Sequence, residues 1–163
     1  MRVLLDVSAV PARPVGAGIY TIEIAARLAA AVDLVLVTRR DDGDRWRSIA
    51  PNAEILAEVP TARPARLVWE QRRAPELARR ARIDLWHGPH YTMPLRLAVP
   101  SVVTVHDLTF FDHPEWHERT KVAFFRRMIR ASVRRASGLI AVDRKSTRLN
   151  SSHVSEFRMP SSA

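Results

Sequence analysis

The sequence predicts an α/β domain with a doubly wound, mostly parallel sheet of the Rossmann type. Short apolar segments rich in branched residues alternate with longer segments of helical spacing. Continuous apolar strands between helices are typical of a parallel sheet whose two faces are both covered. The dipeptide Asn-Gly, a strong hairpin signal, is absent, and this favours helical crossovers over tight turns.

Six strands are expected, and the first is the segment RVLLDV at residues 2–7. The third, at residues 54–59, is the weakest, because Pro51 and Pro60 stand on either side of it. The expected strands comprise residues 2–7, 34–38, 54–59, 83–86, 102–105 and 139–142.

Three helices are expected between these strands. Residues 19–31 carry apolar side chains at helical spacing. Residues 67–81 have a helical pattern too, but Pro75 lacks an amide proton and forces a break or restart within it. A third helix is expected over residues 112–136, with Pro114 in its first turn.

Length and composition indicate one globular domain. The chain has 163 residues, of which 47% are hydrophobic and 26% charged. Because there is no Cys, a disulfide framework, a thiolate nucleophile and a Cys-ligated metal are excluded. Charged residues interrupt each apolar stretch before it reaches membrane-spanning length, and no signal-peptide pattern follows Met1. We therefore expect a cytoplasmic domain.

Residues 144–163 differ in composition from the rest of the chain. They hold six serines, against five in the preceding 143 residues, and show no amphipathic period. The stretch has too few apolar side chains to offset the entropy of ordering it. Its segment KSTRLNSSHVS resembles translated sequencing-adapter read-through. We expect residues 1–142 to form the native domain and residues 143–163 to be a disordered, non-native tail.

The chain is strongly basic, with a formal net charge of +9. Only two of its 26 basic residues are lysines, so 24 are arginines. Arg126, Arg130 and Arg134 recur every four residues on the last expected helix. Such a stripe indicates either a solvated helix face or a surface that contacts an anionic membrane. Aromatic interleaving and a helix-turn-helix pattern are both missing, so nucleic acid is not expected as a partner.

Chemically capable residues follow three of the expected strands. Because parallel strands present their carboxyl ends at one edge of a sheet, the loops after these strands are expected to border a shared crevice. The three loops hold Gly16 and Gly18, His90 and Tyr91, and His106 and Asp107.

The segment VGAGIY lies between the first strand and the first helix. Two glycines here let backbone amides approach a phosphate at the positive end of the helix. Thr21 stands where the last glycine of the dinucleotide fingerprint would be, and no Gly-Lys-Ser/Thr follows. The fingerprint is therefore incomplete and a triphosphate-binding P-loop is excluded. A plain strand-to-helix turn is the alternative.

Five histidines fall between positions 87 and 117. His87 and His90 are three residues apart, but the Gly-Pro between them indicates a turn and not a shared helical face. His106, at the end of a strand, can hydrogen-bond a sugar hydroxyl or transfer a proton near neutral pH. We expect these histidines to line a pocket; a zinc site that also uses nearby aspartates is the alternative.

Together these segments resemble the N-terminal domain of a family 4 glycosyltransferase, in which two Rossmann domains form the GT-B fold. The resemblance covers residues 1–142, and the glycine loop is its least specific part. The matching segments are MRVLLDVSAV followed by GAGIYTIEIAARLA, then IDLWHGPHYTMPL, VVTVHDLTFFDHPEW and RRASGLIAV.

The resemblance implies transfer of a sugar from a nucleotide-diphosphate donor to an acceptor hydroxyl on a glycan or lipid-linked glycan. It further implies retention of the anomeric configuration, no metal and no other cofactor. Gly16 and Gly18 would contact the donor diphosphate, and His106 would be the catalytic residue at the donor sugar. A lipid-linked acceptor would place the protein at the inner face of the membrane. The residues that would face the acceptor or the cleft are Tyr20, His90, Tyr91 and Asp107.

The second Rossmann domain of that family, with the acidic motif that holds the donor, has no counterpart in the sequence. We therefore expect half a site and negligible turnover from this chain alone. Two other classes remain as alternatives: a stand-alone basic module that binds phosphate or an anionic surface, and a His-metal hydrolase. A dinucleotide-dependent enzyme is disfavoured by Thr21.

Overall fold

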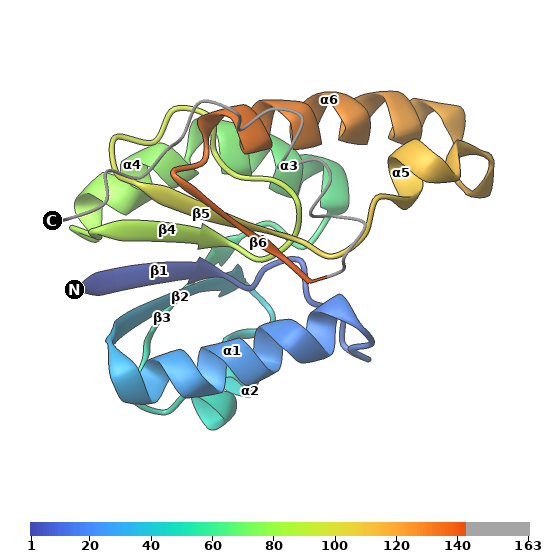
Figure 1. Ribbon diagram of the computed structural model, residues 1–163. Coiled ribbons are helices and arrows are strands. Elements are labelled where there is room, and N and C mark those ends of the chain that lie inside the picture. The colour runs from blue at the N-terminus through green and yellow to red at the C-terminus, as the bar shows by residue number, and fades with distance from the viewer. Residues whose placement is uncertain (143–163) are drawn as a thin grey trace, which may run out of the picture.

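Six strands form a single parallel sheet in the computed structural model, which describes residues 1–142 (Figure 1). The strand order is β3-β2-β1-β4-β5-β6, and each neighbouring pair is parallel. The predicted fold class is confirmed. The strands are β1 (Arg2–Asp6), β2 (Asp33–Arg39), β3 (Glu54–Val59), β4 (Leu85–Gly88), β5 (Ser101–Val105) and β6 (Gly138–Ala141).

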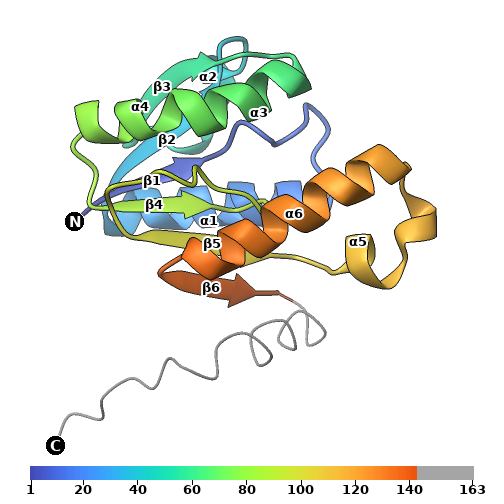
Figure 2. The same ribbon diagram turned by 90° about the horizontal axis from the view of Figure 1, so that it is seen from above.

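Helices cover both faces of the sheet. Figures 1 and 2 show α1 and α2 on one face and α3, α4 and α6 on the other, with α5 beyond the carboxyl ends of the strands. The helices are α1 (Ala17–Ala31), α2 (Gly43–Ile49), α3 (Arg63–Arg72), α4 (Ala74–Arg80), α5 (Thr109–Asp112), the 3₁₀ turn η1 (Pro114–Trp116) and α6 (Arg119–Arg135).

The alternation of side chains along β1 explains why its sequence is continuously apolar. Leu4 packs into the core beneath α3 and α4, whereas Val3 and Leu5 pack into the second core beneath α1 and α2. Successive residues of a strand point to opposite faces, so both sets must be apolar when both faces are covered. The doubly covered sheet therefore follows directly from the sequence pattern.

Helix α2 was not predicted, because its seven residues are mostly polar and show no helical stripe. One side chain fixes it: Trp46 is fully buried, and its indole Nε1 donates to Asp42 Oδ2 at 3.2 Å. So short a helix depends on tertiary packing and not on intrinsic propensity.

The break predicted at Pro75 is confirmed: α3 ends at Arg72 and α4 begins at Ala74, with Pro75 in its first turn. The prediction of one helix over residues 112–136 was wrong. Asp112 is the last residue of α5, and α6 begins only at Arg119. His113 has φ −132° and ψ 59°, outside the helical region, which is consistent with the restriction that a following proline imposes.

The predicted non-native tail, residues 143–163, lies outside the described residues.

Candidate functional site

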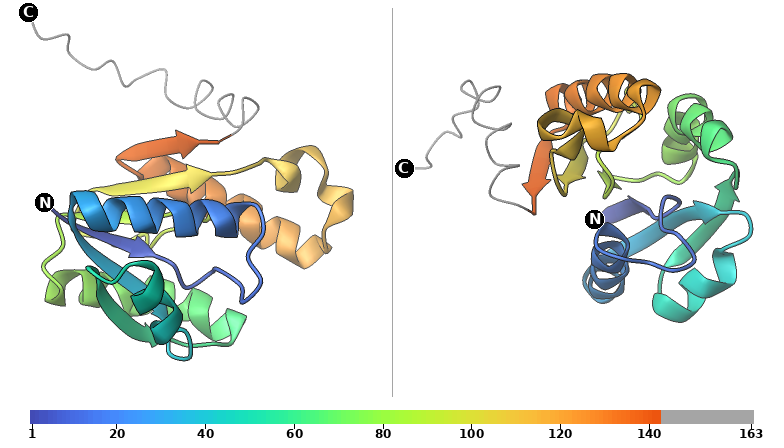
Figure 3. Two further views of the ribbon diagram at one scale, coloured as in Figure 1. Left: turned by 90° about the horizontal axis from the view of Figure 1, so that it is seen from below. Right: turned by 90° about the vertical axis from the view of Figure 1, so that its right-hand side faces the viewer.

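The three predicted loops meet at the carboxyl edge of the sheet, where β1, β4 and β5 end beside one another. Figure 3 shows α1 along one face of these strands and α6 along the other. The loop after β1 leads into α1, and the other two loops follow β4 and β5 directly. This placement is the one expected for the ligand crevice of an open α/β sheet.

The two glycines of the first loop have different roles in the backbone. Gly16 precedes α1 with φ +45°, a conformation that favours glycine, and no neighbour lies within 4 Å of where its Cβ would be. A Cβ on Gly18 would lie 3.0 Å from Pro14 Cβ, and the Gly18 amide donates to the Val15 carbonyl at 2.8 Å. The Gly18 amide hydrogen bond thus closes the turn, whereas the absence of a side chain at Gly16 leaves the space before the first turn of α1 open. Their role at a diphosphate stays a prediction.

His106 lies at the centre of an aromatic cluster. Its ring centroid is 5.0 Å from that of Tyr20, 5.8 Å from that of His90 and 5.9 Å from that of Tyr91. Tyr20 and Tyr91 both meet the imidazole edge to face. The structure therefore brings together four of the residues that the sequence singled out, from three separate segments.

Hydrogen bonds identify the nitrogen of each ring that carries a proton. His106 Nε2 lies 2.7 Å from the Pro89 carbonyl oxygen, which can only accept, so Nε2 donates, and Nδ1 has no hydrogen-bond partner within residues 1–142. The Thr21 hydroxyl donates to the Ala17 carbonyl at 2.8 Å. Thr21 Oγ1 therefore accepts from His90 Nε2 at 3.3 Å. Burial, reinforced by the nearby His106, lowers the pKa of His90 to about 4.

Tyr91 is held in an uncommon conformation. Its φ is +60°, and the Thr92 amide donates to the His90 carbonyl at 2.6 Å, which closes a very tight turn around it. The phenol donates to Asp107 Oδ2 at 2.6 Å. A bulky residue in the left-handed region persists only where its surroundings fix it, and such residues gather at functional sites.

Asp107 holds this arrangement in place. Besides the Tyr91 phenol, it accepts hydrogen bonds from the Thr109 amide at 2.9 Å and the Thr109 hydroxyl at 2.8 Å. Although burial opposes ionisation, the hydrogen bonds from Tyr91 and Thr109 hold the pKa of Asp107 below its usual value. Asp107 is therefore a positioning residue for the β4 and β5 loops.

His87 belongs to the core and not to the crevice. Its side chain is 4% exposed, and Nε2 lies 2.9 Å from Thr104 Oγ1 on the neighbouring strand. Burial lowers its pKa to about 4. Within residues 1–142 no three His, Asp or Glu side chains converge in a way that could hold a metal ion.

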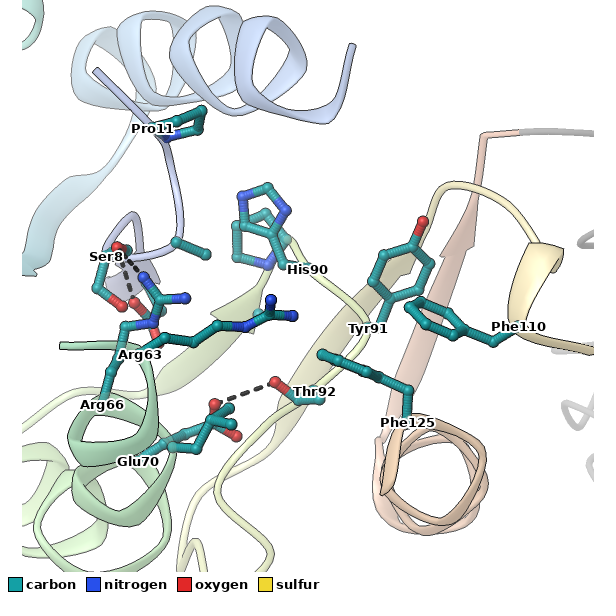
Figure 4. Close-up of a pocket in the computed structure, with 15 residues that line it drawn as sticks. Ser8, Pro11, Arg63, Arg66, Glu70, His90, Tyr91, Thr92, Phe110 and Phe125 are labelled. Carbon is teal, nitrogen blue, oxygen red and sulfur yellow. Dashed lines mark hydrogen bonds between the residues drawn. The ribbon is translucent and has the colours of Figure 1, made fainter. Parts of the chain in front are cut away.

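A pocket of about 370 Å³ opens beside this cluster, between α3 and α6 (Figure 4). His90 and Tyr91 line it, together with residues that the sequence analysis missed. Two features of the sequence could have pointed to them. Asp6 interrupts an apolar run at the end of β1, and Arg66 and Glu70 are one helical turn apart. The lining residues not predicted include Asp6, Arg63, Arg66, Glu70, Thr92, Phe110 and Phe125.

Glu70 is the most unusual of these residues. It is 7% exposed, and its carboxyl group accepts from the Thr92 hydroxyl at 3.0 Å and from Gln71 Nε2 at 2.9 Å. Burial, with repulsion from Asp6, raises the pKa of Glu70 to about 7 despite these hydrogen bonds. Burial also raises the pKa of Asp6. Perturbed carboxyl groups in a cavity are typical of a functional site.

Fold and site together define a Rossmann-type domain with a pocket at the carboxyl edge of its sheet, the edge at which open α/β sheets bind their ligands. The family model described as Glycosyltransferase Family 4 matches residues 14–151, so the chain belongs to glycosyltransferase family 4. The predicted resemblance is confirmed.

The chain is also similar to the O-antigen chain mannosyltransferase B of Escherichia coli, with 25% identity over 142 residues. The match covers 78% of this chain and 37% of that relative, so the chain spans little more than a third of its length.

None of the helices within residues 1–142 combines the length and the apolar character needed to cross a bilayer.

Proposed function

We propose that this chain is the acceptor-side domain of a glycosyltransferase that moves a sugar from a nucleotide-diphosphate donor to a hydroxyl of a glycan or lipid-linked glycan. Membership of the family supports sugar transfer in general. The observation that carries the proposal is the cluster around His106, in which rings from separate segments surround an imidazole with a free Nδ1. Such a nitrogen can accept a hydrogen bond from a sugar hydroxyl.

In this proposal the crevice has two sides that meet at His90 and His106. On the α1 side, the open backbone at Gly16 and the positive end of the helix suit a diphosphate. On the α6 side, the pocket of Figure 4 takes the acceptor. Retention of configuration and independence from metal and other cofactors are parts of the proposal that rest on the family resemblance.

A lipid-linked acceptor would bring the domain to the cytoplasmic face of an anionic membrane, and α6 supports this part of the proposal. The helix carries seven Arg or Lys residues and no Asp or Glu. Arg127, Arg130 and Arg134 are exposed, and Trp116, just before the helix, is 65% exposed. Basic side chains beside an exposed aromatic ring suit a membrane surface.

The test of the donor side is binding, because the proposal expects negligible turnover from this chain alone. Nucleoside diphosphate sugars are titrated into the protein at millimolar concentration and followed by NMR. GDP-mannose comes first, since the Escherichia coli relative is a mannosyltransferase. His106→Ala should weaken binding about tenfold, or about 1.4 kcal/mol, through loss of the ring contact.

The matched control is His113→Ala. The His113 ring stacks on Trp116 and is not part of the His106 cluster. This variant should bind as the wild type does. If no nucleotide sugar binds, or if His106→Ala binds as tightly as the wild type, the proposed donor contact is wrong.

A further inference from the structure

The pocket between α3 and α6 contains two guanidinium groups without a paired carboxylate. Figure 4 shows Arg63 and Arg66 reaching from α3 toward the pocket. Arg66 is half-buried, and its Nη1 donates to the Ser8 carbonyl at 2.9 Å. The Arg63 guanidinium lies over the Phe125 ring, 5.3 Å from its centroid. Neither arginine takes part in any ion pair found among residues 1–142.

This placement carries two electrostatic costs for the folded protein. Burial lowers the pKa of Arg66, although the nearby Asp6 opposes the effect, and a cation that is partly desolvated without a counter-ion is unfavourable. Both arginines also lie near the start of α3, whose first turn holds no acidic residue. The helix dipole disfavours cations at this end. An anionic ligand would remove both penalties.

The two carboxyl groups of the pocket are poor counter-ions. Burial raises the pKa of both Asp6 and Glu70, and the nearby Asp6 charge raises that of Glu70 further. Asp6 already accepts from the Ser8 amide at 3.0 Å, and Glu70 from Thr92 and Gln71. The charge of Arg39 also acts on Arg66. The two guanidinium groups therefore remain available to an anionic ligand.

The side of the pocket that the Arg63 guanidinium contacts is aromatic. Phe110 and Phe125 are stacked with ring centroids 4.6 Å apart, and Tyr91 meets Phe110 edge to face at 6.4 Å. The cavity of about 370 Å³ is at the small end of the range for small-molecule sites. An aromatic side that adjoins a cationic one, in a space of this size, fits a sugar ring that bears a charged group.

We propose that this pocket binds a saccharide that carries a phosphate or a carboxylate, with Arg66 and Arg63 on the anionic group and the Phe110–Phe125 wall on the sugar ring. The inference rests on the proposed function, because it identifies the acceptor of the sugar transfer as an anionic saccharide. Guanidinium groups suit both anions, since their planar donors match phosphate and carboxylate oxygens.

The experiment is isothermal titration calorimetry of the whole chain with three derivatives of one hexose: α-glucosyl phosphate, glucuronate and methyl glucoside. At least one anionic derivative should bind about tenfold or more tightly than the neutral glycoside. The stronger of the two identifies the anion. Arg66→Gln should reduce its affinity to that of methyl glucoside. Arg72→Gln, an exposed arginine on the same helix that does not line this pocket, should have no effect.

A second variant is needed because Arg66→Gln also removes the hydrogen bond from Arg66 to the Ser8 carbonyl. Arg63 is exposed, so Arg63→Gln should fold normally and should still reduce the preference for the anionic sugar. Equal binding of methyl glucoside, a preference that survives both variants, or no binding of any derivative would each overturn the proposal. Inorganic phosphate that binds as tightly as α-glucosyl phosphate would overturn it too, because the sugar would then contribute nothing.

The test is separable from that of the proposed donor site. It measures the binding of hexose derivatives to the wild type and the α3 variants, and it uses neither a nucleotide sugar nor a substitution at His106. A preference of this kind without any binding of nucleotide sugars would contradict the donor contact and leave the present inference intact.

Discussion

The charged side chains at the two ends of strand β1 differ in how they are paired and solvated. At its start, the Arg2 guanidinium pairs with Asp33 at 2.8 Å and also with Glu54, and the Arg2 amide donates to Asp84 Oδ2 at 2.7 Å. The Asp33 side chain is 56% exposed, so water solvates these charges as well. At the other end, Asp6 and Glu70 are desolvated and Arg66 has no carboxylate partner among the described residues.

The difference separates charges that serve the fold from charges that serve a ligand. Exposed ion pairs have little effect on stability, because water already solvates their charges. Desolvated groups destabilise the folded protein and persist where a ligand gains from them. In the proposed function, the amino edge of the sheet is therefore the structural edge and the carboxyl edge is the one that binds ligands.

The largest expected effect comes from the turn that carries His90 and Tyr91. A Cβ at Gly88 would lie 2.5 Å from the Thr92 carbonyl oxygen, so Gly88→Ala must displace the backbone of this turn. We expect a loss of about 3 kcal/mol in the free energy of unfolding, measured by urea denaturation. Gly138→Ala is the control, because its Cβ would meet Val102 Cγ2 at an ordinary 3.5 Å. Equal stability of the two variants would show that the turn is not as constrained as described.

A smaller and pH-dependent effect is expected at Glu70. Its pKa of about 7 in the folded protein exceeds the ordinary value of 4.5, so the folded state holds a proton that the unfolded state releases. The wild type therefore loses stability as the pH rises from about 4.5 to 7. Glu70→Gln removes this loss. The free energy of unfolding of the variant minus that of the wild type should therefore be about 2 kcal/mol larger at pH 8 than at pH 5.

Urea denaturation at the two pH values measures this difference. Glu76→Gln is the matched control, since its side chain is 61% exposed on α4 and should show no such gain. A Glu70→Gln variant whose stability relative to the wild type is the same at both pH values would contradict the description of Glu70 as a desolvated acid.

The smallest effect is expected at the amino edge. Asp33→Asn removes the exposed pair with Arg2 and should cost about 0.5 kcal/mol, less at high salt. Calorimetric binding of sugar ligands should not change. A larger loss of stability, or any loss of binding, would contradict the division of the sheet into a structural and a functional edge.

The sequence was sufficient to predict the fold because two covered sheet faces impose continuous apolar strands, as in residues 2–7. It was sufficient to predict that His90, Tyr91 and His106 share an edge, because parallel topology alone brings their loops together. The geometry between them was not predictable from the chain alone.

The arginines and Glu70 of α3 were not predicted for a physical reason. On a single helix a charge stripe is most simply a solvated face, and desolvation arises only when α6 and the β4 loop close around it. Helix α2 was missed likewise, since burial of Trp46 is a tertiary event. Residues whose role depends on tertiary surroundings are the hardest to predict from the local sequence pattern.

The loops after β4 and β5 are tied to each other twice, through His106 to the Pro89 carbonyl and through Tyr91 to Asp107. Asp107 also anchors Thr109 at the start of α5. These hydrogen bonds join the two loops and the start of α5 into one connected unit, so the backbone around Tyr91 is braced from the β5 side of the crevice.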